Sequence, residues 1–188
     1  MKQSGQSQLK QDTLFTHPCI ISREECAALI SLSENLGFQS ARIKGAWNGP
    51  RGFFVQSGRD NCRVAIDDFE LAAALWQRVR RAVPEKIAHK SVVGLNERLR
   101  FYRYEAGQSF GIHRDGYYKR SDTEQSLLTL ILYLNEEYTG GETFFTDSEN
   151  LIVPNVGKAL LFPHQLWHEG RMVKDGRKYI LRTDVLYK

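Results

Sequence analysis

The sequence of 188 residues has little that could tie it to a membrane or to a disulfide framework. Its three cysteines, Cys19, Cys26 and Cys62, are an odd number without a CxxC pair, which excludes a disulfide scaffold and a zinc knuckle. No apolar run approaches the ~20 residues of a membrane-spanning helix, and the polar N-terminal residues contain no signal-peptide core. We therefore expect a cytoplasmic protein with no membrane partner, in a reducing compartment.

The charge is also too small and too scattered for a nucleic-acid partner. The formal net charge is +4, and no basic stripe with interleaved aromatic residues is present, so no nucleic-acid groove is expected. The length and the 41% of hydrophobic residues predict one domain with its own core. Within it we expect a flexible segment over 1–13, a helical support with a lid loop over 14–92, and a β core over 93–188. The sequence leaves the oligomeric state open.

Two helices are predicted in the first half of the chain. Ser22-Arg-Glu-Glu25 has the spacing of a capping box, which predicts a helix from about Ser22 to Leu36 that Gly37 ends. Its expected apolar face comprises Leu29, Leu32 and Leu36. A second helix is predicted to start at Asp67 or Asp68 and to stop at Pro84. Its expected buried stripe comprises Leu71, Leu75, Val79 and Val83. Between the helices, the Gly, Asn and Pro residues of 45–63 indicate a loop.

From Val93 onward the alternation of side chains changes to the period of β-strands. Strands are predicted over about 95–104, 126–135, 159–162 and 178–187. Helices followed by many short strands favour a mainly β fold with helical support: a double-stranded β-helix, or jelly roll, with the N-terminal helices packed on one sheet. In the first strand, Leu95, Leu99 and Phe101 are expected to face the helices. The opposite face would carry Arg98, Arg100, Tyr102 and Tyr104.

Three residues have the types and spacing of a metal site. His113 and Asp115 lie two residues apart, so on an extended backbone their side chains point to one face. A second histidine, His168, follows further along the chain. Two imidazoles and one carboxylate on one side of a metal leave the opposite coordination positions open, as in the facial triad of non-haem Fe(II) oxygenases.

Three longer motifs surround these residues: Tyr104 to Asp115, Leu134 to Phe145 with its Gly140-Gly141 turn, and His168-Glu-Gly followed by Gly176-Arg-Lys178-Tyr. Together they resemble the 2-oxoglutarate and Fe(II)-dependent dioxygenases, in the branch that contains the prolyl 4-hydroxylases. The likeness is close over about 93–187. It implies a 2-oxoglutarate-dependent hydroxylase that uses Fe(II), 2-oxoglutarate and O2, with ascorbate as a supporting reductant. The reaction would hydroxylate an unactivated C–H bond and give succinate and CO2.

The resemblance also implies roles for individual residues. His113, Asp115 and His168 would be the catalytic iron ligands. Lys178 would bind the C5 carboxylate of 2-oxoglutarate. Arg182, on the same face, would hold the other end of the cosubstrate or a substrate carboxylate; alternatively it anchors the C5 carboxylate itself, or pairs structurally with Asp184. Hydroxyl groups that would hydrogen-bond the cosubstrate belong to Thr143 and Tyr104, with Tyr102 beside them.

The substrate is expected to be a small molecule such as an amino acid. A peptidyl prolyl 4-hydroxylase acting on a peptide or protein is the alternative, and a noncatalytic metal-binding jelly-roll module is the alternative of another class. Candidate substrate contacts are Arg98, Arg100, Tyr117 and Arg120. For the arginines the competing interpretation is a solvated surface or an ion pair with acids such as Asp67 or Asp68. The remaining histidines, His17, His89 and His164, are interpreted as structural or exposed.

Overall fold

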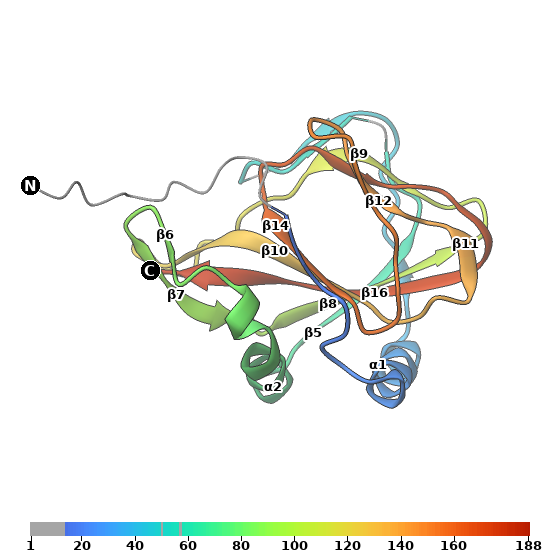
Figure 1. Ribbon diagram of the computed structural model, residues 1–188. Helices are drawn as coiled ribbons and strands as arrows, with labels where there is room; N and C mark the ends of the chain where they lie inside the picture. Colours follow the sequence, from blue (N-terminus) through green and yellow to red (C-terminus); the bar gives the residue numbers. More distant parts are fainter. Residues whose placement is uncertain (1–13, 50, 57) are drawn as a thin grey trace, which may run out of the picture.

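The computed structural model describes residues 14–188 except 50 and 57, and the segment 1–13 lies outside the described residues. Two β-sheets face each other and two helices lie below one of them (Figure 1). This architecture confirms the expected mainly β jelly roll. None of the helices in the described residues is long and apolar enough to cross a membrane.

The larger sheet has the strand order β1-β14-β10-β16-β8-β5-β2, with β7 and β11 also beside β16 and β6 beside β7. Its strands are β1 (Phe15–His17), β2 (Gln39–Ser40), β5 (Cys62–Asp67), β6 (Lys86–Ile87), β7 (Lys90–Leu95), β8 (Arg98–Glu105), β10 (Gln125–Tyr133), β11 (Tyr138–Gly140), β14 (Ala159–Pro163) and β16 (Val173–Tyr187). The smaller sheet has the order β13-β12-β15-β9-β4-β3. Its strands are β3 (Trp47–Asn48), β4 (Phe54–Val55), β9 (Phe110–Arg114), β12 (Thr143–Phe145), β13 (Asn150–Ile152) and β15 (His168–Gly170).

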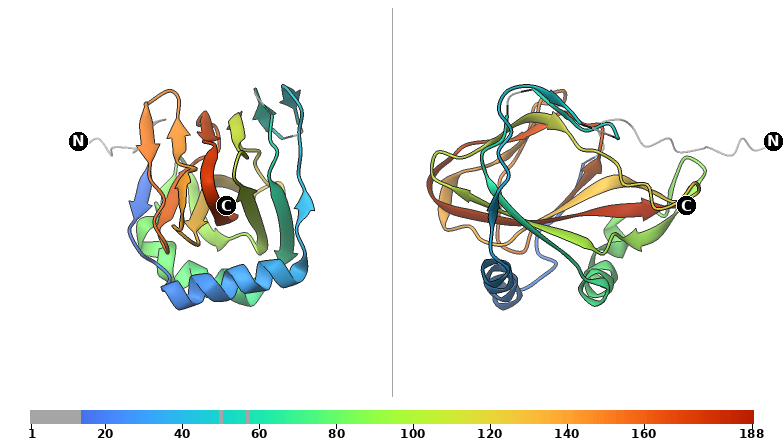
Figure 2. Two further views of the ribbon diagram at one scale, coloured as in Figure 1. Left: turned by 90° about the vertical axis from the view of Figure 1, so that its right-hand side faces the viewer. Right: turned by 180° about the vertical axis from the view of Figure 1, so that it is seen from behind.

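The helices α1 (Arg23–Leu36) and α2 (Phe69–Val79) lie along the outer face of the larger sheet, and Figure 2 shows both of them below it. A 3-10 turn, η1 (Arg80–Ala82), follows α2. The capping box at the start of α1 is present: the Ser22 hydroxyl accepts from the Glu25 amide, and the Glu25 carboxylate accepts from the Ser22 amide. Both helices therefore begin where the sequence predicts, α2 with Asp68 as its N-cap.

The buried face of α1 differs from the prediction. Cys26, Leu29 and Ser33 are buried, whereas Leu32 is only partly buried and Leu36 is 42% exposed. Ser33 can be buried because its hydroxyl donates to the Ile30 carbonyl, 2.7 Å away. The buried face of α1 therefore passes through Ser33, whose hydroxyl is satisfied, and not through Leu32 and Leu36 as predicted.

The prediction of a loop over 45–63 is correct only in part, because three strands occupy some of this segment. The strands β3 and β4 form a hairpin in this segment, and β5 begins at Cys62 and runs to Asp67. β5 pairs with β8 along its whole length, from Cys62 opposite Arg103 to Asp67 opposite Arg98. The sequence pattern missed β5 because its stability comes from this pairing with a distant strand, not from a local signal.

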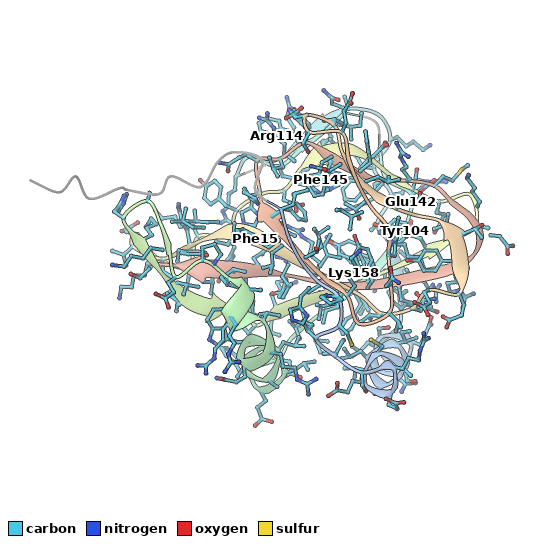
Figure 3. The ribbon with its side chains drawn as sticks, in the orientation of Figure 1. Phe15, Tyr104, Arg114, Glu142, Phe145 and Lys158 are labelled. Atoms are coloured by element: carbon cyan, nitrogen blue, oxygen red, sulfur yellow. The ribbon has the colours of Figure 1, made fainter. Side chains whose placement is uncertain are left out.

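The two faces of the larger sheet take part in two separate cores. On the outer face, Leu99, Phe101 and Leu181 pack in one cluster with buried residues of both helices, as expected for the apolar face of the first strand. On the inner face, Tyr102 and Tyr104 belong to a second cluster with residues of the smaller sheet, and side chains fill the space between the sheets (Figure 3). The candidate metal ligands lie in this inner core.

Candidate active site

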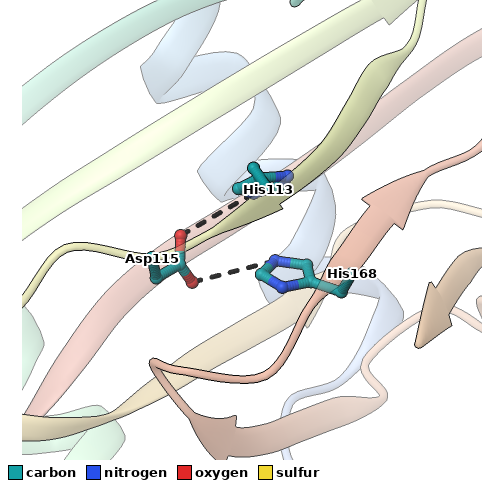
Figure 4. Close-up of side chains that lie close together, drawn as sticks. All are labelled: His113, Asp115 and His168. Atoms are coloured by element: carbon teal, nitrogen blue, oxygen red, sulfur yellow. Dashed lines mark ion pairs between the residues drawn. The ribbon is translucent and has the colours of Figure 1, made fainter. Parts of the chain in front are cut away.

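His113, Asp115 and His168 meet between the sheets (Figure 4). His113 on β9 and His168 on β15 are directly opposite each other in the antiparallel ladder, and Asp115 follows the end of β9. The three side chains are only 3–4% exposed, and one donor atom from each lies within 4.8 Å of the others. The Asp115 carboxylate is 3.8 Å from His113 Nε2 and 3.9 Å from His168 Nε2.

Both imidazoles make their hydrogen bonds through Nδ1, which leaves Nε2 of each ring available to a metal. His113 Nδ1 is 2.8 Å from the Gly111 carbonyl, and His168 Nδ1 is 2.9 Å from the Leu166 carbonyl. A carbonyl only accepts, so each Nδ1 carries the proton and each Nε2 presents a lone pair. Burial lowers the pKa of both imidazoles, although Asp115 acts in the opposite direction, so both are neutral. Neutral, oriented imidazoles of this kind are metal ligands.

Asp115 is held as a carboxylate. Burial raises the pKa of its carboxyl group, but Arg182 and the two neighbouring imidazoles lower it by more, so the pKa lies below its ordinary value. Arg182 Nη2 is 3.2 Å from Asp115 Oδ1, and the Thr129 hydroxyl is 2.6 Å from Oδ2. Two neutral imidazoles and an ionised carboxylate fit a divalent iron ion.

His164 is buried close to these residues but is not in the group of metal-ligand candidates. Its Nδ1 is 2.9 Å from the Thr129 hydroxyl and its Nε2 is 2.8 Å from the Ser126 hydroxyl. Sequence reasoning missed Thr129 and Ser126. The signal was available, because both are buried polar residues in the largely apolar strand β10.

Lys178 occupies the same cavity as the three metal-ligand candidates. Its side chain is 2% exposed, its ammonium group donates to the Gly141 carbonyl at 2.6 Å, and it lies 5.2 Å from the ring centroid of Tyr104. No carboxylate of the described residues lies within 4.0 Å of it, although Glu142 acts on it from further away. Burial lowers its pKa to about 8, and Glu142 offsets this in part. A buried cation without a bound counter-ion fits the distal carboxylate of 2-oxoglutarate.

Hydroxyl groups surround this cation. Tyr104, Tyr102 and Thr143, which the resemblance assigns to the cosubstrate, line this cavity. Thr143 is buried and its hydroxyl lies 2.7 Å from that of Tyr133, whose ring centroid is 5.6 Å from the Lys178 ammonium group. Tyr133 is a further residue that sequence reasoning missed. Tyr133 and Thr129 are four residues apart on β10, so their side chains point to the same, inner face of the sheet.

The second basic residue, Arg182, is bound by two carboxylates. Its guanidinium group is 3.2 Å from both Asp115 and Asp184. Asp184 also binds Arg100 at 3.1 Å. The structural pairing of Arg182 with Asp184 is thus present, while Arg182 still lines the cavity of the metal-ligand candidates.

A second pocket, of about 350 Å³, adjoins this cavity and shares Tyr102, Phe110 and Arg182 with it. Of the substrate candidates from the sequence, Arg100 and Tyr117 line this pocket. The other two are not in its lining: Arg98 binds Asp67, and Arg120 binds Glu97 and Glu124. The lining also contains Trp47, Arg51, Phe53 and Arg59, all within the segment predicted as a lid loop between the helices. Arg63 and Phe110 line it as well, and the sequence did not single them out as substrate contacts.

The electrostatics of this second pocket are strongly positive. Burial raises the pKa of Tyr102, but nearby guanidinium groups lower it by more, so its pKa lies below the ordinary value. These groups belong to Arg182, Arg100, Arg63 and Arg59. Four arginines from different segments of the chain therefore surround one phenol at the junction of the two cavities.

In this chain, two imidazoles and one carboxylate lie together on the inner face of a double-stranded β-helix. This arrangement is typical of non-haem iron enzymes with a facial triad. Comparison with known proteins agrees. Residues 99–183 match the family model of the 2OG-Fe(II) oxygenase superfamily. A PKHD-type hydroxylase of Gloeothece citriformis is 24% identical over 176 residues, which cover 89% of this chain and 75% of that protein.

Two further relatives belong to the prolyl hydroxylases. The protein named probable prolyl 4-hydroxylase 11 of Arabidopsis thaliana is 25% identical over 159 residues, and the match covers 75% of this chain but 49% of that protein. The crystal structure of a viral collagen prolyl hydroxylase from Paramecium bursaria Chlorella virus-1, in complex with 2-oxoglutarate, has a TM-score of 0.67 at 22% identity and covers 92% of this chain and 95% of that one.

Over residues 99–183 the chain matches the 2OG-Fe(II) oxygenase superfamily, and its curated relatives include proteins named as prolyl 4-hydroxylases. The resemblance stated from the motifs is thereby confirmed, as are the enzyme class, a 2-oxoglutarate-dependent hydroxylase, and the cofactors Fe(II) and 2-oxoglutarate.

Proposed function

We propose that the protein hydroxylates an unactivated C–H bond of a small molecule. The observation that carries the use of 2-oxoglutarate is the position of Lys178, which is buried in one cavity with His113, Asp115 and His168 and pairs with no carboxylate of the described residues. In the overall reaction, O2 and 2-oxoglutarate are consumed, succinate and CO2 are released, and the C–H bond becomes C–OH. One oxygen atom of O2 enters succinate and the other enters the product. Bound Fe(II) and 2-oxoglutarate supply this oxidising chemistry.

The residues of the chain have distinct tasks in this proposal. His113, Asp115 and His168 would hold the iron, since one donor atom of each lies within 4.8 Å of the others. Lys178 binds the C5 carboxylate of 2-oxoglutarate, and the Thr143 hydroxyl donates to the same group. Burial of the whole set excludes water, which strengthens each charge-assisted hydrogen bond.

The charges favour Lys178 over Arg182 as the anchor of the cosubstrate. Arg182 already contacts Asp115 and Asp184, whereas Lys178 has only a carbonyl partner among the described residues. The C5 carboxylate of 2-oxoglutarate would therefore bind more strongly at Lys178 than at Arg182, because at Lys178 it neutralises a desolvated charge. Arg182 orients Asp115 and contributes to the wall of the adjoining pocket.

A second candidate function is the hydroxylation of a prolyl residue in a peptide or protein, which the names of the relatives support. The same iron and cosubstrate residues would serve it. The two candidates differ in the substrate that stimulates succinate release. A screen of free amino acids and other small acids against proline-containing peptides separates them.

The experiment that tests the iron and cosubstrate site is an anaerobic titration of the metal-free protein with Fe(II) and 2-oxoglutarate. The measured quantity is the weak visible charge-transfer band of the iron-bound cosubstrate. We expect a band in the wild type that is lost in His113→Ala and weakened more by Lys178→Ala than by Arg182→Ala. Absence of the band in folded wild-type protein would instead support a noncatalytic metal-binding module.

A further inference from the structure

We propose that the substrate is a small anionic molecule whose carboxylate or phosphate group binds the arginines of the 350 Å³ pocket, while its apolar part lies beside His113. This inference rests on the hydroxylase function proposed above and specifies the substrate class. We call the pocket the arginine pocket. Its arginines are Arg51, Arg59, Arg63, Arg100 and Arg182.

The arginine pocket has an excess of positive charge. Its lining contains five arginines and no aspartate or glutamate. Arg100 and Arg182 share Asp184, and Arg182 also contacts Asp115. No ion pair joins the other three arginines to a carboxylate of the described residues. Positive charge that converges in a concave site attracts and orients an anion.

Three of these arginines come from adjacent strands of the larger sheet. Arg182 on β16 is directly opposite Arg100 on β8, and Arg63 on β5 is directly opposite Tyr102, two residues further along β8. Like charges directly opposite each other destabilise a sheet. Asp184 offsets part of this repulsion, and an oxyanion bound in front of the strands would offset the remainder.

Arg59 is positioned from a separate segment of the chain. Its Nε donates to the Ala41 carbonyl at 2.6 Å, and its guanidinium carbon lies 5.0 Å from the ring centroid of Phe110. Nε makes this backbone bond, and neither terminal nitrogen has a hydrogen-bond partner among the described residues. A guanidinium end of this kind can bind a carboxylate or phosphate with two parallel hydrogen bonds.

The apolar side of the pocket leads to the metal ligands. The Phe110 ring stacks on His113 with centroids 3.5 Å apart, and the Phe53 ring centroid lies 6.2 Å from that of His113. Trp47 packs edge-on against Phe53 at 5.4 Å. A molecule held at its anionic end by Arg59 and Arg63 would therefore place its apolar part against these rings, next to the iron ligand.

The size of the pocket favours a small molecule over a peptide. A volume of about 350 Å³ lies at the lower end of the range for small-ligand pockets. Carboxylate and phosphate share the oxyanion chemistry that arginine recognises, so the experiment has to separate them. An acidic peptide is the competing occupant and forms a further arm of the test.

The test is calorimetric titration of the protein, loaded anaerobically with Fe(II) and 2-oxoglutarate, with phenylacetate, phenyl phosphate and the neutral 2-phenylethanol. All titrations are carried out at the same ionic strength, because salt ions screen the charges of the arginines. We expect at least one of the two anions to bind about tenfold more tightly than the neutral probe. Arg63→Gln and Arg59→Gln should each reduce this preference by roughly tenfold. Arg63 is exposed, so its variant should fold even if the Arg59 variant does not.

Arg98→Gln is the matched control, because Arg98 lies on β8 two residues from Arg100 but binds Asp67 outside the pocket. Equal affinity for charged and neutral probes, or equal losses in Arg98→Gln and Arg63→Gln, would overturn the proposal. Tighter binding of an acetylated tetraglutamate peptide than of both small anions would overturn it in favour of an acidic peptide. The charge-transfer band is recorded for every sample. If the wild type lacks it, the hydroxylase function fails, and titration of the metal-free protein still decides whether the arginine pocket binds anions.

Discussion

The hydroxyl group of Thr129 lies 2.6 Å from Oδ2 of Asp115 and 2.9 Å from Nδ1 of His164. Burial lowers the pKa of His164 to about 4, so its imidazole is neutral and carries a single N–H. The carboxylate of Asp115 can only accept, so Thr129 donates to it and accepts from His164 Nδ1–H. His164 Nε2 then accepts from the Ser126 hydroxyl at 2.8 Å. A directed chain of hydrogen bonds thus ends on a metal-ligand candidate.

Thr129→Val should weaken metal binding by about tenfold or more, because Asp115 loses the donor that orients it. Thr129→Ser keeps the hydroxyl group and should bind metal almost as the wild type does. Competitive titration with a metal-sensitive dye under anaerobic conditions measures both affinities. Wild-type affinity in the valine variant would mean that Arg182 alone orients the carboxylate.

The affinity for 2-oxoglutarate should depend on pH through Lys178. Burial lowers the pKa of this lysine to about 8 in the cofactor-free protein. Below pH 8 the ammonium form is already present and the affinity should be constant. Above it the protein must take up one proton to bind, so the dissociation constant should rise by about tenfold per pH unit. Equilibrium binding at pH 7 to 10 measures this, and a constant affinity up to pH 10 would contradict it.

The same lysine should affect the stability of the cofactor-free protein. Its folded pKa of about 8 lies below the ordinary lysine value of 10.5, so between these pH values the unfolded chain binds more protons than the folded protein. The free energy of unfolding contributed by Lys178 should therefore rise with pH across this window. Urea unfolding at pH 7.5 and pH 10 should show this rise in the wild type relative to Lys178→Met, which has no group to titrate. Parallel curves for the two proteins would refute the assignment.

Tyr133→Phe should weaken 2-oxoglutarate binding several-fold, by about 1 kcal/mol, because the Thr143 hydroxyl loses its partner at 2.7 Å. Metal affinity should not change. Tyr138→Phe is the matched control, since the Tyr138 hydroxyl is buried with no hydrogen-bond partner among the described residues. Its removal should leave 2-oxoglutarate affinity as it is. Equal effects of the two substitutions would show that general packing is responsible.

Arg98→Gln and Arg120→Gln should both leave catalytic efficiency unchanged. Arg98 forms an exposed ion pair with Asp67, and Arg120 binds Glu97 and Glu124 outside both cavities. Exposed pairs contribute about 0–1 kcal/mol, so only a small loss of stability is expected. Succinate release at several substrate concentrations provides the measurement. A raised Michaelis constant in either variant would indicate that this arginine contacts the substrate.

Much of the site could be predicted because its signals are local. His113 and Asp115 are two residues apart on one strand, so their common face follows from the geometry of an extended chain. The helix start at Ser22 was equally local, since a capping box involves residues three apart. By contrast, β5 was missed because its six residues gain their stability from β8, more than thirty residues further along the chain.

By itself, the sequence indicated the fold class from the order and period of its elements and, through the resemblance of its motifs to a known family, the enzyme class and the residues expected to bind iron and cosubstrate. Only the tertiary structure decided which arginines line the pocket beside the metal-ligand candidates. Arg98 and Arg100 alternate on one strand and look alike in sequence, yet one binds Asp67 outside the pocket and the other lines it with Arg59 and Arg63. The difference arises because the position of a charged side chain depends on which strands pair beside it and where the nearest carboxylate lies.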